Sequence, residues 1–390
     1  MRRSTVTLLL AFGVLVAACQ SGETTAIPVT AEPATGFATE ISWTQHSLPD
    51  DFAVHALTAV GGRIFGLALP NIEAPDARTR LWVTDDGASS WEAIDIDATE
   101  FGMRAGYFRE IAQVGNRYVA IVKGEPIDSD LVDIWLVVSD DAVVWERVDT
   151  GGGIPIGIAG GDSGAIAVVG FDDPDARYRY EVLHSADGVD WTSGTSSEFE
   201  KMGPFQPIEV FENRFYIMAL VDGQPARLVT SADSSEWRSW SAPPLDQIYV
   251  LDPGSGAGGL VLLTRDNRHW QTWLLDFTGT WVETTPPSFE PSLGHWASSN
   301  AVLSDPDGIV VAIVDTGRSG GPQDPAMYDP PTVWWTLDGD DWQAVAGSDA
   351  FGSEGTIGAA TVLAGTIFVV YHTHPDRIHS LWTGDAFGWP

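Results

Sequence analysis

Cysteine, positive charge and long apolar runs are all scarce in this chain of 390 residues. Its single cysteine excludes a disulfide bond within the chain. Lysine and arginine together number 20 against 54 aspartates and glutamates, which gives a net charge of −34 at pH 7. So acidic a surface repels phosphate and excludes an electrostatic nucleic-acid binder. The charge, with a hydrophobic fraction of only 44%, also excludes a protein built of many membrane-spanning helices.

Aromatic residues, by contrast, are abundant. The chain has 17 Trp, 16 Phe and 8 Tyr, whereas charged residues make up 19% of it. Large aromatic side chains supply much apolar surface that folding can bury. The composition therefore predicts a substantial core and excludes an intrinsically disordered chain.

The N-terminus carries a targeting signal. Two arginines precede an apolar run from Val6 to Ala18, whose 13 residues are fewer than the roughly 20 that span a membrane. The run predicts a signal peptide, and it ends in Val16-Ala17-Ala18-Cys19, which resembles the lipobox of bacterial lipoproteins. The resemblance implies that residues 1–18 are removed and that Cys19 is acylated. The exported protein would then be anchored by lipid at the cell envelope, in the periplasm or on the cell surface.

The segment after the cysteine differs in composition from the rest of the chain. Residues 20–39 are rich in Thr, Ala and Pro and show no apolar periodicity. We therefore expect the lipidated Cys and a flexible tether over residues 19–40, followed by one folded body over residues 41–390.

A repeat with a mean period of about 49 residues runs through this body, and periods of roughly 40 to 50 residues are typical of propellers and arrays. Each copy has a strand-like apolar stretch, then Ser or Thr, one residue, Asp, a short polar turn and Trp. Successive repeat tryptophans lie 44 to 61 residues apart. The clear copies end at Trp91, Trp145, Trp191, Trp237 and Trp342, and degenerate copies end at Trp281 and Trp389.

These copies resemble the Asp-box, or BNR, repeats of sialidase-like β-propellers, although most have one residue fewer between Asp and Trp. In such a hairpin loop, the Asp side chain can accept hydrogen bonds from turn amides, and the Trp can pack between neighbouring sheets. The resemblance implies that the repeat residues build the fold. They are Asp86, Trp91, Asp141, Trp145, Asp187, Trp191, Asp233, Trp237, Asp338 and Trp342.

Two β-rich runs joined by a tight turn precede each repeat copy, and there are seven such pairs, for example Ile111 to Val122 around Gly115-Asn116. Each unit then supplies four strands in a meander, so we predict an all-β, seven-bladed propeller of four-stranded antiparallel blades. Trp43 opens an outer strand that has no inner strands before it. Residues 41–48 are therefore predicted to complete the seventh blade and close the ring.

The connectors between second and third strands, and between blades, lie on the face opposite the repeat turns. By fold analogy, this connector face is the candidate binding face. Its candidate residues are Arg104, Tyr107, Arg177, Tyr178, Arg268, Arg318, Tyr328, His372, His374 and Arg377. Among the connectors, we expect the one from Asp315 to Pro331 to determine which ligand binds, because long loops in compact folds often form contact surfaces.

Two connector patterns have a structural and a functional interpretation. Pro-Asp-Ala-Arg recurs at residues 75–78 and 174–177, which favours a turn with a local ion pair over a ring of carboxylates that attracts cations. His372-Thr373-His374 places two imidazoles on one side of a strand, and the functional interpretation of this pair is a zinc site completed by His379 or Asp376. Our prediction is nevertheless that the chain has no metal and no cofactor.

The leading functional hypothesis is a noncatalytic, membrane-anchored module that binds or scaffolds a polymer, peptide, glycan or protein partner, acts as a monomer and binds no nucleic acid. The alternative is a sialidase-like glycoside hydrolase with a diverged active site. The resemblance implies that such an enzyme needs three arginines, an acid/base Asp and a Tyr activated by Glu. The family's Arg-Ile-Pro element is replaced here by Arg63-Ile64-Phe65, in a turn on the repeat side.

Overall fold

Nearly every described segment of the chain is a β-strand. The computed structural model describes residues 41–49, 52–68, 79–85, 87–127, 132–161, 163–171, 179–194, 199, 202–211, 214–221, 224–232, 236–241, 252–256, 259–265, 270–275, 280–284, 295–304, 310–318, 328–336, 342–344, 351, 355–373 and 379–385. The predicted signal peptide and tether lie outside these residues.

The strands of the described residues form seven four-stranded antiparallel sheets. In six of them, four strands that follow one another in the chain also lie side by side. The first consists of β2(Val54–Val60), β3(Arg63–Ala68), β4(Thr79–Thr84) and β5(Glu92–Ile96). The second consists of β6(Met103–Val114), β7(Arg117–Pro126), β8(Asp133–Ser139) and β9(Glu146–Arg147). The third consists of β10(Ile154–Gly161), β11(Gly164–Phe171), β12(Arg179–Ser185) and β13(Thr192–Gly194).

The fourth sheet consists of β14(Met202–Phe211), β15(Arg214–Val221), β16(Gln224–Ser231) and β17(Arg238–Ser241). The fifth consists of β18(Asp252–Gly256), β19(Gly259–Arg265), β20(Trp270–Leu275) and β21(Trp281–Thr284). The sixth consists of β22(His295–Ser304), β23(Val310–Arg318), β24(Tyr328–Thr336) and β25(Gln343–Ala344). The seventh sheet combines β26(Gly355–Leu363), β27(Thr366–Thr373) and β28(His379–Asp385) with β1(Trp43–His46) from the N-terminal side. One 3-10 helix, η1(Ala98–Phe101), leads from β5 into β6.

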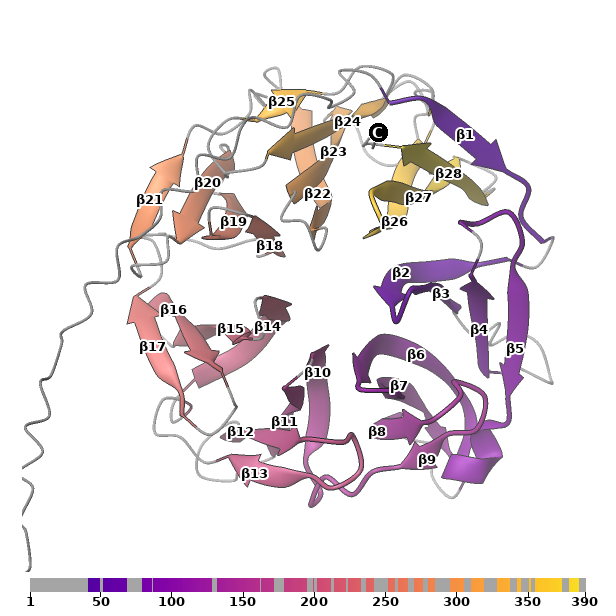
Figure 1. The fold of residues 1–390 in the computed structure, drawn as a ribbon, viewed down its shortest axis with the longest axis vertical. Helices are drawn as coiled ribbons and strands as arrows, with labels where there is room; N and C mark the ends of the chain where they lie inside the picture. The colour runs from indigo at the N-terminus through magenta and orange to yellow at the C-terminus, as the bar shows by residue number, and fades with distance from the viewer. Residues whose placement is uncertain are drawn as a thin grey trace, which may run out of the picture. The chain divides into compact units, whose positions relative to one another are not determined.

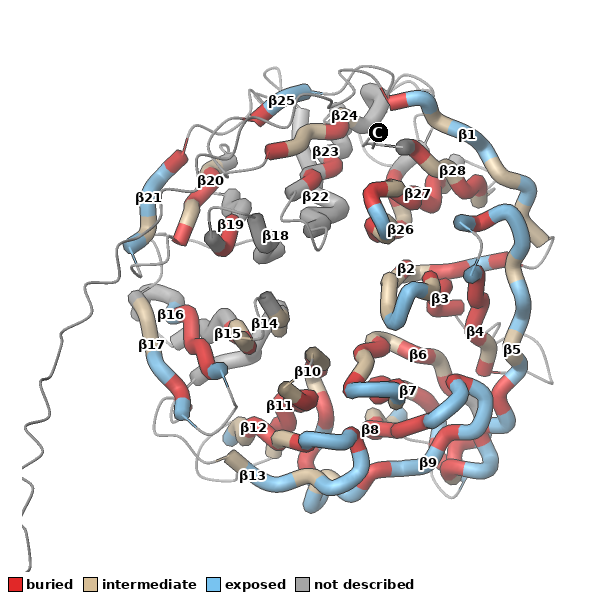
Figure 2. The backbone as a smooth tube through the Cα atoms, in the orientation of Figure 1, coloured by how far each residue is buried: buried red, intermediate tan, exposed pale blue. Residues whose placement is uncertain are grey.

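Composition changes from the inner to the outer strands of a sheet. The second strand β11 reads GAIAVVGF and is buried along almost its whole length, because neighbouring sheets cover both of its faces. The fourth strands β5, β9 and β13 are largely exposed (Figure 2). A continuous apolar run therefore marks an inner strand, and a short polar strand after a Trp marks the outer edge.

The sheets follow one another around a common centre (Figure 1). The first strand of each sheet contacts the first strand of the next sheet, from β2 through β6, β10, β14, β18 and β22 to β26, and β26 contacts β2. At one such contact, a Cβ on Gly160 would come within 2.1 Å of the backbone oxygen of Gln113, so only glycine fits there. The fold is an all-β propeller with four-stranded antiparallel blades.

The N-terminal strand pairs with the C-terminal strand. Trp43 lies opposite Gly384 in the register of β1 and β28, and the imidazole of His46 is hydrogen-bonded to the hydroxyl of Thr383 at 2.6 Å. Ile41 is 3% exposed, and the Trp43 ring lies 4.6 Å from that of Phe351. The predicted pairing of the two ends of the folded body is confirmed.

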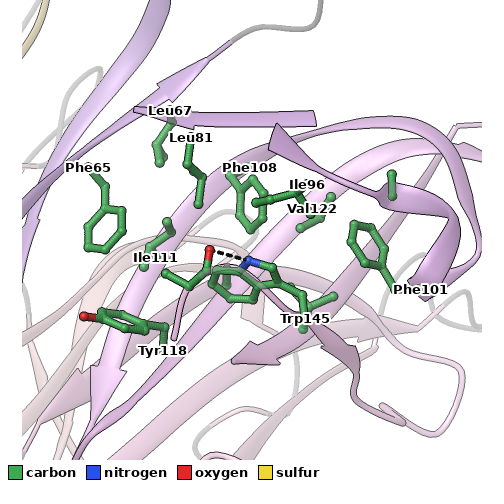
Figure 3. Packing of buried hydrophobic residues seen from close by; sticks show 14 of the residues in the cluster. Phe65, Leu67, Leu81, Ile96, Phe101, Phe108, Ile111, Tyr118, Val122 and Trp145 are labelled. Atoms are coloured by element: carbon green, nitrogen blue, oxygen red, sulfur yellow. Dashed lines mark hydrogen bonds between the residues drawn. The ribbon is translucent and has the colours of Figure 1, made fainter. Parts of the chain in front are cut away.

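The core consists of separate clusters between adjacent sheets. One cluster joins the sheet of β2–β5 to the sheet of β6–β9 and includes Phe65, Phe108 and Trp145 (Figure 3). Others join the β6–β9 sheet to the β10–β13 sheet, and the β26–β28 sheet to the β2–β5 sheet. Fully burying one such side chain stabilises the fold by about 1.5–3 kcal/mol, so each interface contributes substantially.

Two hairpin turns illustrate how the first and second strands are connected. The β2–β3 turn uses Gly61 and Gly62, with φ values of 63° and 76°, whereas the β26–β27 turn uses Ala364 at 49° before Gly365 at 77°. Positive φ at both central residues defines a turn that matches the twist of the two strands, and it is strained for alanine.

We expect Ala364→Gly to raise the free energy of unfolding by about 0.5–1 kcal/mol, because it relieves this strain at an exposed position. Gly62→Ala is the matched control, because a Cβ at Gly62 meets nothing within 4 Å and the substitution tests the backbone alone. It should lower the free energy by a similar amount. Urea unfolding measures both, and a loss of stability in Ala364→Gly would contradict the prediction.

Candidate functional site

At one end of the sheets, the repeat turns are fixed by their aspartates. In the β8–β9 turn, Asp141 Oδ1 accepts hydrogen bonds from the backbone amides of Val143 and Val144 at 2.8 and 2.9 Å. Trp145 Nε1 donates to the carbonyl of Ala142 at 3.0 Å. The amides, that of Val144 first, hold the pKa of the Asp141 carboxyl below its ordinary value.

The next repeat turn, between β12 and β13, has the same arrangement. Asp187 Oδ1 accepts from the amides of Val189 and Asp190 at 2.9 and 3.1 Å, and Trp191 Nε1 donates to the carbonyl of Gly188 at 2.9 Å. The same amides lower the pKa of the Asp187 carboxyl. These bonds stay within each turn and hold its shape.

The repeat tryptophans pack between their own sheet and the preceding one. Trp145 does so in the cluster of Figure 3, and Trp91, Trp191, Trp237 and Trp281 do so at four other interfaces. Trp342 is also buried. Asp86, Asp233 and Asp338 lie outside the described residues.

Arg63 lies at the same end of the sheets as the repeat turns, as the sequence predicts. Its guanidinium forms an ion pair with Asp85, with Nε 2.6 Å from Oδ1, at the start of the β4–β5 turn. It therefore takes part in a surface ion pair at the end opposite the connectors.

The candidate residues of the connector face are only partly described. Arg104 and Tyr107 lie on the connector half of β6, and Arg104 donates to the carbonyl of Ile127 at 3.3 Å. Arg318 ends β23 and Tyr328 begins β24, so both lie at the connector end of one sheet. Arg177, Tyr178, Arg268, His374 and Arg377, the Pro-Asp-Ala-Arg segments and most of the 315–331 connector lie outside the described residues.

His372 is brought against a histidine of the neighbouring strand. It pairs in register with His379 across β27 and β28, and the two rings contact edge to face with centroids 4.2 Å apart. Burial lowers the pKa of the His379 imidazole, which favours its neutral form. No group of three or more His, Cys, Asp or Glu side chains in the described part of the chain is arranged to hold a metal ion.

A recurrent irregularity in the first strands creates a cluster that the sequence did not predict. The register between first and second strands shifts by one residue, which inserts an unpaired residue and re-aims its side chain. The inserted residue lies five positions before the end of its strand in β2, β6, β10 and β26. These equivalent residues are His55, Arg109, Ile156 and Gly358.

Two of these inserted residues belong to one cluster where β2 and β6 meet. The His55 ring contacts the Tyr107 ring edge to face, with centroids 5.5 Å apart. Burial lowers the pKa of His55, and the nearby charge of Arg109 adds to this shift, although a hydrogen bond with the backbone of Leu67 opposes it. The cluster therefore combines a neutral imidazole, a phenol and a half-buried guanidinium on adjacent innermost strands.

Glu110 extends this cluster to the next sheet. Its Oε2 accepts a hydrogen bond from the backbone amide of Ile158 on β10 at 2.9 Å. Burial raises the pKa of the Glu110 carboxyl, although the Ile158 amide and the charge of Arg109 oppose the shift. Glu110 thus links two innermost strands and stands beside the arginine.

We expect Glu110→Gln to gain stability relative to wild type as the pH rises above about 4.5, the ordinary pKa of Glu. A raised pKa means that the folded state holds the proton where the unfolded state releases it, so wild-type stability falls through this range. Glutamine carries no charge and still offers an oxygen to the Ile158 amide. Urea unfolding between pH 4 and 8 measures the difference, with the exposed Glu92→Gln as control. Parallel curves for the wild type and Glu110→Gln would contradict the prediction.

The sequence nevertheless carried a signal for this cluster. Arg109 and Glu110 are adjacent charged residues between Phe108 and Ile111, which breaks the alternation of apolar and polar residues expected in a strand. Such a break indicates an inserted residue. Chemically, the cluster can bind an anion through Arg109 and pack a ring or an apolar group against Tyr107.

None of the described residues belongs to a helix long and apolar enough to cross a membrane. No protein-family model matches the chain, and no curated protein matches it either. Solved structures do resemble it.

A catalytically inactive variant of virginiamycin B lyase from Staphylococcus aureus, solved with quinupristin, is 8% identical over 89% of this chain and 99% of that one, with a TM-score of 0.53. A Trypanosoma rangeli sialidase bound to the inhibitor DANA is 14% identical, with a TM-score of 0.42. That match covers 88% of this chain, which spans only 58% of the length of the sialidase. The β-propeller domain of the Trilobed protease from Pyrococcus furiosus is 10% identical over 70% of this chain and 79% of that one, with a TM-score of 0.43. At these identities, the likeness to the lyase concerns the fold alone.

Proposed function

We propose that this protein is a noncatalytic binding module, and that an anionic group of a glycan, peptide or protein partner binds where β2 and β6 meet. The observation that carries the proposal is Arg109, a half-buried guanidinium on an innermost strand. No carboxylate of the described residues forms an ion pair with it. Its charge acts on Glu110, but the Glu110 carboxyl accepts the Ile158 amide, so the guanidinium is left for a ligand.

The pairing of other arginines supports this reasoning. Arg63, Arg80, Arg117 and Arg179 each form an ion pair with a carboxylate. In a chain with 54 acidic and 20 basic residues, acidic side chains that could pair with an arginine are in excess. A guanidinium that is half-buried without such a pair has lost hydration that a single ligand carboxylate or sulfate can replace.

The remaining parts of the proposal concern the cellular location of the protein and the number of its blades. We propose that residues 1–18 are a lipoprotein signal peptide, that Cys19 is lipidated, and that residues 19–40 tether the propeller to the cell envelope. The repeat turns are proposed to be Asp-boxes, and the seven sheets to be the full set of blades. Cys19→Ser should release the protein from the membrane fraction, whereas retention there would contradict the lipid anchor.

The binding proposal is tested on arrays of acidic glycans and of peptides. Arg109→Gln should weaken binding of any captured acidic ligand by about ten-fold or more, the usual effect of losing a charge-assisted contact. Arg80→Gln is the matched control, because Arg80 pairs with Asp95 on the outer strands. Equal binding by wild type and Arg109→Gln would overturn this site.

A sialidase-like hydrolase is the second candidate, because Tyr107, Arg109 and Glu110 lie on one strand. The Glu110 carboxylate, however, already accepts the Ile158 amide, which favours a structural role. A fluorogenic sialoside and a panel of aryl glycosides distinguish the candidates. Turnover that Tyr107→Phe or Arg109→Gln abolishes would refute the noncatalytic proposal.

A further inference from the structure

A pocket lies at the opposite end of the sheets from the connectors, between two repeat turns. It has a volume of about 200 Å³ and is lined by the β8–β9 turn, by Arg117 at the start of β7 and by Val189 of the β12–β13 turn. The pocket therefore spans the boundary between two adjacent sheets.

Valine side chains flank this pocket and face solvent. Val143 is 47% exposed, Val144 53% and Val189 46%, and the last two line the pocket. The backbone amides of all three donate to Asp141 or Asp187, so these turns hold the valines in place. Because the backbone of the valines is already fixed, a partner that covers their side chains orders less of the protein on binding.

The charges around the pocket favour a basic partner. Arg117 pairs with Asp140 and donates to the carbonyl of Asp187, so it joins the two turns. Asp140, Asp187 and Glu146 all raise the pKa of Arg117. Three carboxylates thus surround one guanidinium that Asp140 already engages, which leaves an excess of negative charge beside the exposed valines.

We propose that this surface, formed by Val144, Val189, Arg117, Asp140 and Glu146, binds a segment of a partner protein in which an aliphatic residue stands beside Lys or Arg. Charge complementarity selects this occupant. A second copy of the chain carries a charge of −34 and is repelled. Residues 20–39 of the chain itself contain Glu23 and Glu32 but no Lys or Arg, so they do not suit the surface either.

The surface is independent of the proposed anion site. Arg109 lies at the middle of β6, whereas Arg117 follows the turn after the last residue of that strand, Val114. A basic, apolar segment and an anionic ligand are also opposite in charge. One protein could therefore hold two different partners at two separate sites.

The probe is a random library of twelve-residue peptides displayed on phage and panned on the immobilised protein. Enriched peptides are then synthesised with a fluorescent label, and their dissociation constants are measured by anisotropy. We expect enriched peptides to combine aliphatic residues with Lys or Arg. Val144→Ser/Val189→Ser and, separately, Glu146→Lys should each weaken their binding by about ten-fold or more.

The controls separate this surface from general adhesion and from misfolding. Val282→Ser should leave binding unchanged, because Val282 is 47% exposed on another sheet. The double variant should keep the wild-type melting temperature, because both valines are exposed. The proposal is overturned if no peptide is enriched, if enriched peptides lack Lys and Arg, or if they bind the double variant as tightly as wild type. Self-association that the double variant abolishes would also overturn it in favour of a second copy.

Discussion

A variant that begins at residue 50 is expected to lose about 5 kcal/mol or more of unfolding free energy, because it lacks the strand that completes the last sheet. The loss includes the burial of Ile41, the contact of Trp43 with Phe351 and the ladder hydrogen bonds of β1 to β28. Small domains are stable by only about 5–15 kcal/mol in total. Removing one strand should therefore destabilise the whole ring.

Urea and thermal unfolding measure this loss against a chain that begins at residue 37 and keeps β1. We expect one cooperative transition in the longer chain, and a midpoint lower by about 10 °C or more in the shorter one. An unchanged midpoint would show that β1 contributes little and would contradict closure by the N-terminal strand.

Gly384→Ala gives an independent test of the same contact. A Cβ at this position would lie 2.4 Å from Cγ2 of Ile41 and 2.8 Å from Cε3 of Trp43, so the first strand must move away. The substitution should destabilise the longer chain clearly and the shorter chain much less, because the shorter chain has no such neighbours. Equal costs in the two backgrounds would contradict the close packing of Ile41 against Gly384.

Trp145→Ala is expected to cost about 3–5 kcal/mol, the usual range for removing a large aromatic side chain from a core. Trp145 is 2% exposed, its ring lies 4.9 Å from that of Phe108, and it packs between two sheets. Guanidinium unfolding measures the cost. A value near that of an exposed residue would contradict the packing role of the repeat tryptophans.

Trp145→Phe separates packing from hydrogen bonding at the same position. It keeps an aromatic ring in the cluster but removes the donor to the carbonyl of Ala142. An unpaired buried carbonyl costs about 1–3 kcal/mol, so this variant should lie between wild type and Trp145→Ala. A cost as large as that of alanine would assign the effect to the hydrogen bond.

The sequence predicted the elements that depend on local pattern. Short apolar runs, glycine turns and the regular tryptophans identified the hairpins, and Trp43 identified an outer strand without partners of its own. That strand does pair with β28. Such features are readable because turn residues and strand periodicity are encoded within a few positions of one another.

The long first strand of the second sheet was harder to predict. The sequence indicated a strand from about Ile111, whereas β6 begins at Met103. Residues 103–110 contain Gly106 and three charged side chains, which disfavour a strand on propensity alone. Pairing with β7 as far as Pro126 overrides that preference, because it satisfies the backbone of both strands.

The cluster of His55, Tyr107 and Arg109 could be predicted only in part. Tyr107 is a candidate from the sequence because it lies near a connector, but His55 and Arg109 are themselves inserted residues, which become visible only when two strands are paired. Propensity scales score one segment at a time and do not contain this register. Counting back from each hairpin turn would have aligned His55 with Arg109.

Dividing the apolar contacts among the boundaries between sheets has an evolutionary consequence. A substitution at Phe108 affects neighbours on the two sheets that share its cluster, and the clusters two boundaries away do not include it. Compensating substitutions at one boundary between sheets can then accumulate independently of those at the other boundaries. A protein that accumulates substitutions in this way keeps its fold after its sequence similarity to its homologues has been lost.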